Sequence, residues 1–199
     1  LPLALAVDEV VAVEPSRSML RVLRAGLTEH GIDNVRVVEG YWPVQPLPSA
    51  DVALMAHVGY DIEDFAGFLD AAEVAADRCL VIMRASAANR SSFELWSEIH
   101  GQARAAYPML PELLTLLVAR GRVPEVTLVE REMWGYRDKA EMLASMRRML
   151  GLKADSAKDR VLQRLIDERA RERGGLWDID GAPMLDGLVT WPAPPGDTG

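Results

Sequence analysis

The sequence contains almost no cysteine and no hydrophobic run long enough to cross a membrane. Among its 199 residues there is one cysteine, Cys79, so no disulfide can form within the chain and no cysteine-based metal site can be assembled. No apolar stretch approaches the roughly 18 residues of a membrane span, and residues 1–7 lack the pattern of a signal peptide. We therefore predict a soluble cytoplasmic protein with no membrane partner and no metal site.

Positive charge is also scarce. The chain has 22 Lys and Arg against 30 Asp and Glu, which gives a net charge of -8. Binding to a nucleic-acid backbone is driven largely by Lys and Arg that neutralise phosphates, so we expect no nucleic-acid partner. With 49% apolar and 26% charged residues, the composition is that of an ordinary globular domain. A small molecule is the expected partner.

Strands and helices alternate in the first part of the chain. A β-branched run ends at Glu14, and Ser16 is predicted to cap a helix that ends near His30. Because strands that alternate with helices form parallel sheets with helices on both faces, the fold class is α/β, a doubly wound sheet. The further elements predicted here are strands over residues 35–39, 51–58 and 78–84, the second of them buried on both faces, and a helix that begins at Asp61.

The second part of the chain has consecutive helices without an intervening strand, which indicates an insertion. Each of these segments carries helical periodicity and a capping residue at its start. The elements predicted in this part are helices that begin at Ser91 and Pro111, a strand over residues 126–134, helices over 138–150 and 156–173, and a final strand over 185–191.

Glu14 is the residue with the clearest functional meaning. A carboxylate at the carboxyl end of a parallel strand lies where open α/β sheets bind nucleotides, and it can accept hydrogen bonds from ribose hydroxyls. An ordinary exposed acid at a turn would give the same pattern. In a dinucleotide site the acid lies about 20 residues beyond the glycine-rich turn, whereas only thirteen residues precede Glu14. We expect the phosphate-loop equivalent to lie outside this sequence.

These segments resemble the class I S-adenosylmethionine-dependent methyltransferases. Residues 14–16 with Met19 and Leu20 are similar to that family's second strand and helix start, and residues 37–40 and 50–54 to its third and fourth strands. The resemblance is good up to about Arg84 and extends beyond it only in outline. It implies a Rossmann-like, mostly parallel seven-stranded sheet with helical insertions, whose antiparallel last strand, residues 185–191, lies beside residues 126–134. It also implies S-adenosylmethionine as the cofactor.

The sequence departs from that family in two places. The family carries Gly-x-Gly-x-Gly after its first and central strand, and this sequence contains neither. We therefore expect an N-terminally incomplete domain, inactive alone, with a gap between the strands that begin near Glu9 and Asp51. After Gly40 the family usually has an aspartate for the adenine amino group, but Tyr41 and Trp42 stand here. Adenine is then held by aromatic stacking, or Trp42 packs beneath the loop.

The resemblance divides the chain into three parts. Residues 1–90 form the cofactor-binding half of one domain, residues 91–193 its remainder with the helical insertions, and residues 194–199 a disordered tail. The insertions bring Trp96, Tyr107 and Met109, which either form an apolar acceptor pocket as a lid or pack into a satellite core.

Few catalytic residues are expected, because the cofactor supplies the chemistry and the site supplies alignment and a base. His57 lies at the carboxyl end of the fourth strand with Tyr60 close behind, and these two are the catalytic candidates; a structural histidine is the alternative. Arg84 pairs an acidic acceptor group or a neighbouring carboxylate, and His30 and His100 bind carbonyls at helix ends. The expected cofactor-binding residues are Glu14, Pro15, Ser16, Met19, Gly40, Tyr41, Trp42, His57 and Val58.

The function predicted from the sequence is direct methyl transfer from S-adenosylmethionine to a small, partly hydrophobic acceptor. Two alternatives stay open. One is a nicotinamide-dependent Rossmann oxidoreductase, which would share the acid–ribose contact but normally shows a Tyr-x-x-x-Lys or comparable signature that is not visible here. The other is a noncatalytic methyltransferase-like scaffold.

Overall fold

A computed structural model describes residues 1–85, 91–104, 107–131, 135–179 and 185–195. Contacts between Cα atoms divide the chain into two compact units. The first unit comprises Leu1–Ala53, Asp64–Cys79 and Pro192–Gly199, and the second comprises Leu54–Glu63 and Leu80–Trp191. The boundaries predicted at residues 90 and 193 stay a prediction, and most of the predicted disordered tail, residues 196–199, lies outside the described residues.

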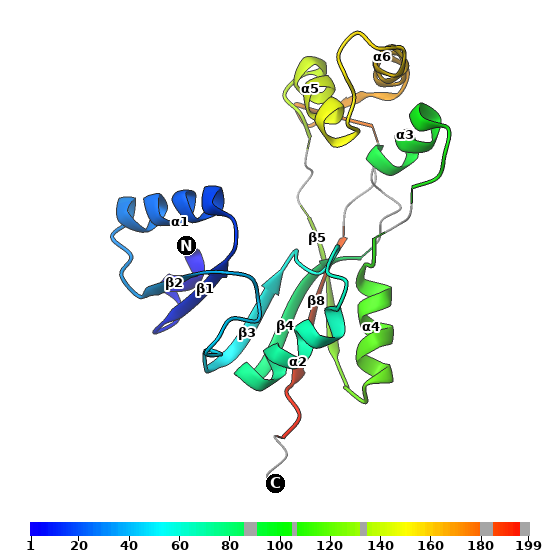
Figure 1. Ribbon diagram of the computed structural model, residues 1–199. Helices are drawn as coiled ribbons and strands as arrows, with labels where there is room; N and C mark the ends of the chain where they lie inside the picture. Colours follow the sequence, from blue (N-terminus) through cyan, green and yellow to red (C-terminus); the bar gives the residue numbers. More distant parts are fainter. Residues whose placement is uncertain (86–90, 105–106, 132–134, 180–184, 196–199) are drawn as a thin grey trace. The chain divides into compact units, whose positions relative to one another are not determined.

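The first unit begins with a short 3-10 helix, Pro2–Leu5, followed by a β–α–β segment (Figure 1). Strand β1 (Val10–Glu14) pairs in parallel with β2 (Val35–Glu39), and helix α1 (Arg17–Glu29) connects them. The hydroxyl of Ser16 accepts a hydrogen bond from the backbone of Met19, so Ser16 is the predicted helix cap. These elements confirm the prediction, because local cap chemistry and apolar spacing determine them.

A four-stranded sheet has the order β3-β4-β8-β5. Its strands are β3 (Ala50–Ala56), β4 (Ala76–Arg84), β8 (Leu185–Pro192) and β5 (Glu125–Glu130), and β5 runs antiparallel to β8. This arrangement confirms the predicted antiparallel last strand beside β5. Residues 132–134, which were predicted to extend β5, lie outside the described residues.

Strand β3 is less buried than predicted. Val52 is 48% exposed and Leu54 is 41% exposed, so the prediction of a strand covered on both faces was wrong. The physical reason is that β3 lies at an edge of its sheet, where a strand has a hydrogen-bonded partner on one side only. Among the described strands, none is paired with both β1 and β3.

Helix α2 (Phe65–Ala75) begins four residues later than predicted. Asp64 rather than Asp61 is its cap, since the Asp64 carboxylate accepts a hydrogen bond of 2.9 Å from the backbone of Gly67. Leu69 is buried, but Val74 is 77% exposed. Five residues turn a helix by about 500°, so Val74 lies on a different face from Leu69.

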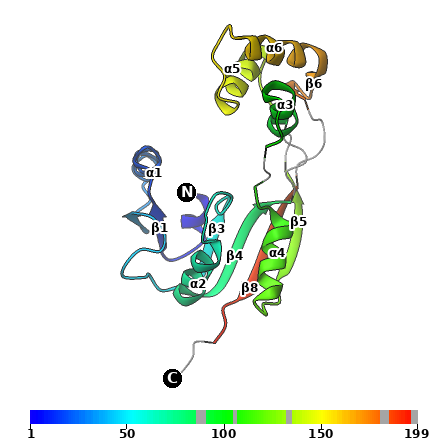
Figure 2. The same ribbon diagram turned by 45° about the vertical axis from the view of Figure 1, so that its right-hand side comes forward.

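Helix α4 (Leu110–Ala119) lies along strand β8 in the second unit (Figure 2). A Cβ atom at Gly187 would lie only 2.6 Å from Leu110 Cδ2, so this glycine permits the helix to approach the strand. Pro111 lies in the first turn as predicted, and the helix begins one residue before it.

The second unit also contains a helical region formed by α3 (Ser91–His100), α5 (Lys139–Met149) and α6 (Ala157–Arg169). Figure 1 shows α5 and α6 side by side, with α3 close to α6. The predicted helix over residues 156–173 ends at Arg169, because Gly174 and Gly175 turn the chain at positive φ into a hairpin. The strands of this hairpin are β6 (Arg171–Arg173) and β7 (Leu176–Asp178).

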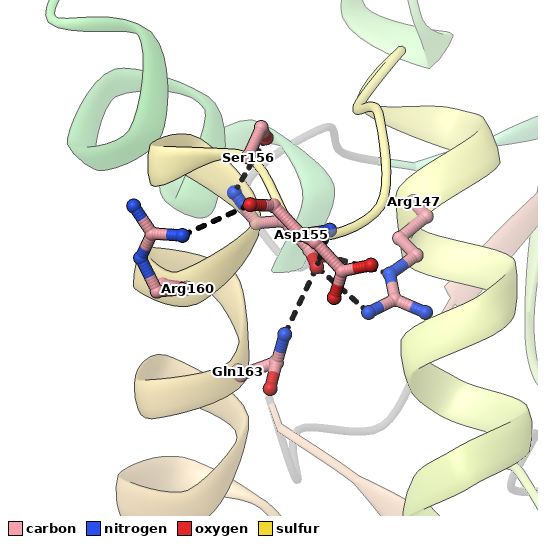
Figure 3. Close-up of polar contacts among 6 residues, drawn as sticks. Arg147, Asp155, Ser156, Arg160 and Gln163 are labelled. Carbon is pink, nitrogen blue, oxygen red and sulfur yellow. Dashed lines mark hydrogen bonds and ion pairs between the residues drawn. The ribbon is translucent and has the colours of Figure 1, made fainter.

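A buried carboxylate, Asp159, connects α5 to α6, and its partners Arg147, Asp155 and Gln163 are labelled in Figure 3. Arg147 donates two hydrogen bonds of 2.7 Å to it, and Asp155 N–H and the Gln163 amide each donate one of 2.9 Å. The Arg147 guanidinium lowers the pKa of Asp159 to about 2. Both oxygens of this carboxylate therefore accept hydrogen bonds, and the two from Arg147 hold α5 against α6.

Candidate functional site

The first group of candidate residues lies at the carboxyl ends of β1 and β2. Glu14 and Glu39 are direct partners in the parallel register. Glu14 Oε1 accepts a hydrogen bond of 2.7 Å from Ser16 N–H, which holds the carboxylate over the turn into α1. Glu39 instead pairs with Arg17 at 3.1 Å. Glu14 makes no ion pair with any described residue, so it keeps acceptor capacity for a ligand hydroxyl.

Three other predicted cofactor residues surround this turn. Pro15 is exposed and follows Glu14 directly. Met19 is 55% exposed, so its side chain is not part of the core. Gly40 donates its N–H to the carbonyl of Glu14 at 3.2 Å, which joins the ends of the two strands.

The two aromatic residues after Gly40 have different environments. Tyr41 is 82% exposed. Trp42 donates its indole N–H to the carbonyl of Phe68 at 3.1 Å and meets the Phe68 ring edge-on at 6.3 Å. Trp42 is thus a packing residue of the first unit, and Tyr41 is the aromatic side chain available for stacking on a base.

The second group lies in the second unit, after β3 and β4. His57 has a φ of 54°, a left-handed conformation that is costly for a residue with a side chain, and its N–H donates to the carbonyl of Ile82 at 2.8 Å. His57 Nδ1 lies 3.2 Å from the Tyr60 hydroxyl. That hydroxyl accepts a hydrogen bond of 3.1 Å from Arg84 N–H. The predicted catalytic pair is therefore in direct contact.

Sequence reasoning missed Asp186, a buried acid on β8 that lies behind His57. Asp186 Oδ2 is 3.6 Å from His57 Nε2 and 3.4 Å from Arg131 Nε. Its other oxygen, Oδ1, is buried and has no hydrogen-bond partner among the described residues. The signal in the sequence was a charged residue inside a strand whose other positions are mostly apolar, which is rare unless the charge is paired or functional.

Two neighbours complete this group. Val58 is 38% exposed, and it precedes Gly59, which adopts a φ of 92°. Arg84 makes no ion pair with a described residue, so the alternative in which it satisfies a neighbouring carboxylate finds no support there.

Two residues of the predicted lid, Trp96 and Tyr107, both contact Arg104. The Trp96 ring stacks on His100 at 4.0 Å, and the Arg104 guanidinium lies 4.7 Å from the centre of the Trp96 ring. Arg104 also donates to the Tyr107 hydroxyl at 2.9 Å. Met109 is buried at the start of α4. These contacts favour the satellite core over an open pocket.

The other two histidines lie near helix ends, as predicted. His100 Nε2 is 3.1 Å from the carbonyl of Leu150, the residue that caps α5. His30 is the C-terminal cap residue of α1, and its backbone N–H donates to the Gly26 carbonyl. Their positions assign them no catalytic role.

The described residues contain neither a metal-binding cluster nor a membrane-spanning helix. They contain no cluster of three or more His, Cys, Asp or Glu that could hold a metal ion. None of the helices in these ranges is long and apolar enough to span a bilayer.

Comparisons with known proteins identify the fold. No family model and no curated protein matches the sequence. Among solved structures, the YcgJ protein from Bacillus subtilis matches with a TM-score of 0.58 at 16% identity, over 96% of this chain and 84% of that one. A proposed methyltransferase from Bacillus halodurans matches with a TM-score of 0.57 at 14% identity, over 95% and 84%.

A third similar structure is that of a cyclase. The [4+2]-cyclase SpnF matches with a TM-score of 0.54 at 12% identity, over 98% of this chain and 71% of that one. The chain therefore has the Rossmann-like fold of the class I S-adenosylmethionine-dependent methyltransferases, as its sequence predicted. Fold alone does not determine the reaction, so the function must be argued from the residues.

Proposed function

We propose that the protein is an S-adenosylmethionine-dependent methyltransferase that acts on a small, partly hydrophobic acceptor. The observation that carries this proposal is the Glu14 carboxylate, held by Ser16 N–H at the carboxyl end of β1 in a chain with the methyltransferase fold. In an open α/β sheet this is the position at which an acid accepts hydrogen bonds from ribose hydroxyls.

The residues present fit the nucleoside part of the cofactor. Glu14 would hold the ribose, and the exposed ring of Tyr41 offers a face for adenine. The sequence contains no Gly-x-Gly-x-Gly, and Glu14 and Tyr41 carry the proposed contacts to the nucleoside. S-adenosylmethionine would supply a methyl group on a sulfonium centre, and the electron pair of the broken carbon–sulfur bond would stay on sulfur.

The chain's own residues would then bind, orient and deprotonate the acceptor. His57 and Tyr60 form a hydrogen-bonded pair that can take up a proton. Arg84, which has no ion pair among the described residues, would pair with an acidic group of the acceptor.

Isothermal titration calorimetry on the natural gene product that contains this sequence tests the proposal. Glu14→Gln keeps the acceptor for Ser16 N–H but removes the charge. We expect the variant to bind S-adenosylmethionine roughly 10- to 100-fold more weakly, because a hydrogen bond to a charged group contributes about 1.5–3 kcal/mol.

Glu9→Gln is the matched control, since Glu9 immediately precedes the same strand and pairs with Arg36 at 3.5 Å. It should leave the affinity unchanged. Equal affinity in Glu14→Gln and the unmodified protein would remove Glu14 from the site. Tighter binding of NAD than of S-adenosylmethionine would favour an oxidoreductase, and binding of neither would favour a noncatalytic scaffold.

A further inference from the structure

The polar groups that follow β3 and β4 form a chain of contacts with Asp186 on β8, and for a neutral His57 this chain favours one arrangement of protons. It begins at the backbone N–H of Arg84, passes through the Tyr60 hydroxyl to His57, and ends at the buried Asp186 carboxylate. Each distance lies between 3.1 and 3.6 Å. The hydrogen-bonding capacity of each group determines where the protons are.

The contacts of Tyr60 determine where its hydroxyl proton points. A backbone N–H can only donate, so the Tyr60 oxygen accepts from Arg84. The phenol has one proton of its own, and His57 Nδ1 at 3.2 Å is positioned to accept it. With Nδ1 as the acceptor, a neutral His57 ring carries its proton on Nε2.

The Asp186 end requires the same tautomer. An ionised carboxylate can only accept, and Asp186 Oδ2 faces His57 Nε2 at 3.6 Å. The opposite tautomer would place the Nε2 lone pair against the carboxylate and leave Tyr60 Oη facing two donors. Arg131, 3.4 Å from the same oxygen, offsets the charge of the buried acid.

The backbone supports this arrangement. His57 keeps its left-handed conformation, with a φ of 54°, at the end of an edge strand. Strain of this kind persists only where surrounding contacts impose it, and it concentrates at functional sites. Here the His57 N–H is bound to the Ile82 carbonyl while the ring contacts Tyr60 and Asp186.

We infer that Tyr60, His57 and Asp186 form a proton relay in which Tyr60 Oη receives the proton of the methyl acceptor and Asp186 is the positioning residue that fixes the His57 tautomer. This inference rests on the proposed methyl transfer. It assigns the acceptor-facing base to Tyr60 rather than to His57.

Every proton that moves during the proposed methyl transfer has a donor and an acceptor. As the acceptor atom bonds to the methyl carbon, its proton passes to Tyr60 Oη, and the proton that Tyr60 held passes to His57 Nδ1. His57 then carries a positive charge opposite Asp186. Release of one proton from His57 Nδ1 to water, by way of Tyr60 Oη, restores the starting arrangement.

Long-range ¹H–¹⁵N NMR of the histidine rings tests the relay without cofactor or acceptor. The unliganded protein should show His57 with its proton on Nε2. Asp186→Asn removes the negative charge opposite Nε2 and introduces an amide that can present a donor there, so we expect the tautomer ratio to move toward Nδ1–H by roughly tenfold or more. Tyr60→Phe should shift the His57 Nδ1 resonance to that of an acceptor without a hydrogen bond.

Two controls separate these effects from a loss of structure. His100, whose Nε2 faces the Leu150 carbonyl, should keep the same tautomer in every variant. Asp167→Asn, at an exposed ion pair with Lys139, should leave His57 unchanged. Thermal unfolding of each variant confirms that it is folded.

Two results would overturn the relay: His57 protonated on Nδ1 in the unmodified protein, or an unchanged His57 spectrum in both Asp186→Asn and Tyr60→Phe. Failure of the proposed function is distinguishable, because it would show as absent S-adenosylmethionine binding in calorimetry while the tautomer is unaffected.

Discussion

Two buried aspartates in the second unit differ in how well their oxygens are satisfied. Asp159, between α5 and α6, accepts hydrogen bonds of 2.7–2.9 Å at both oxygens. Asp186, on β8, has ion-pair contacts of 3.4 and 3.6 Å at one oxygen and, within the part of the chain that the structure describes, no hydrogen-bond partner at the other. Natural proteins leave buried polar groups poorly satisfied mainly at functional sites. The difference indicates that Asp159 holds the fold and Asp186 serves the site.

The largest expected effect is at Asp159. Asp159→Asn removes one partner of a buried ion pair, so we expect the free energy of unfolding to fall by about 2–3 kcal/mol. The effect should be at the lower end of the range for such pairs, because Arg147 is 27% exposed and can be hydrated. Urea denaturation measures this change, and a loss below about 0.5 kcal/mol would contradict the structural role of Asp159.

The hydrogen bonds to Asp159 should also make the free energy of unfolding depend on pH. The pKa of Asp159 is lowered from 3.8 to about 2 in the folded protein, so its contribution is complete above about pH 4 and disappears as the pH falls toward 2. The stability difference between the unmodified protein and Asp159→Asn should therefore shrink by about 2 kcal/mol over that interval. Denaturation at pH 5 and pH 2 checks this; a constant difference would contradict it.

Asp186→Asn should have a much smaller effect on stability. Its carboxylate is desolvated without full hydrogen bonding, so replacing it with a neutral isostere should change the free energy of unfolding by less than about 1 kcal/mol and can even raise it. Denaturation under the conditions used for Asp159→Asn allows direct comparison. A loss of unfolding free energy as large as that of Asp159→Asn would show that Asp186 also stabilises the fold.

The smallest effect belongs to the exposed pair of Asp167 with Lys139, 3.3 Å apart. Asp167→Asn should change the free energy of unfolding by less than about 0.5 kcal/mol, since exposed ion pairs contribute little. It serves as the baseline for both buried acids. A larger change would mean that the loss of a charge, rather than the burial of the acid, determines how much unfolding free energy each variant loses.

Local chemistry explains which parts of the fold could be predicted from the sequence. The caps at Ser16, Asp138 and Ser156 and the strand ending at Glu14 depend on neighbouring residues, and each was correct. The predicted end of α6 and the predicted burial of β3 were wrong. The end of α6 depends on the hairpin that follows it, and the burial of β3 depends on the position of this strand in its sheet.

The candidate site was predictable only in part for the same reason. His57 and Tyr60 are three residues apart, so the sequence at the end of one strand was enough to predict both as candidates. Asp186 and Arg131 join them through the order β3-β4-β8-β5, which places distant segments side by side. No local pattern connects these residues to His57.

The central claim, that Glu14 binds the ribose of S-adenosylmethionine, is tested most directly by a thermodynamic cycle. Calorimetry compares S-adenosylmethionine with its 2′,3′-dideoxy analogue in the natural gene product and in Glu14→Gln. We predict that removal of the hydroxyls weakens binding roughly 10- to 100-fold in the unmodified protein and has little further effect in the variant. Equal losses in both proteins would show that Glu14 does not contact the ribose.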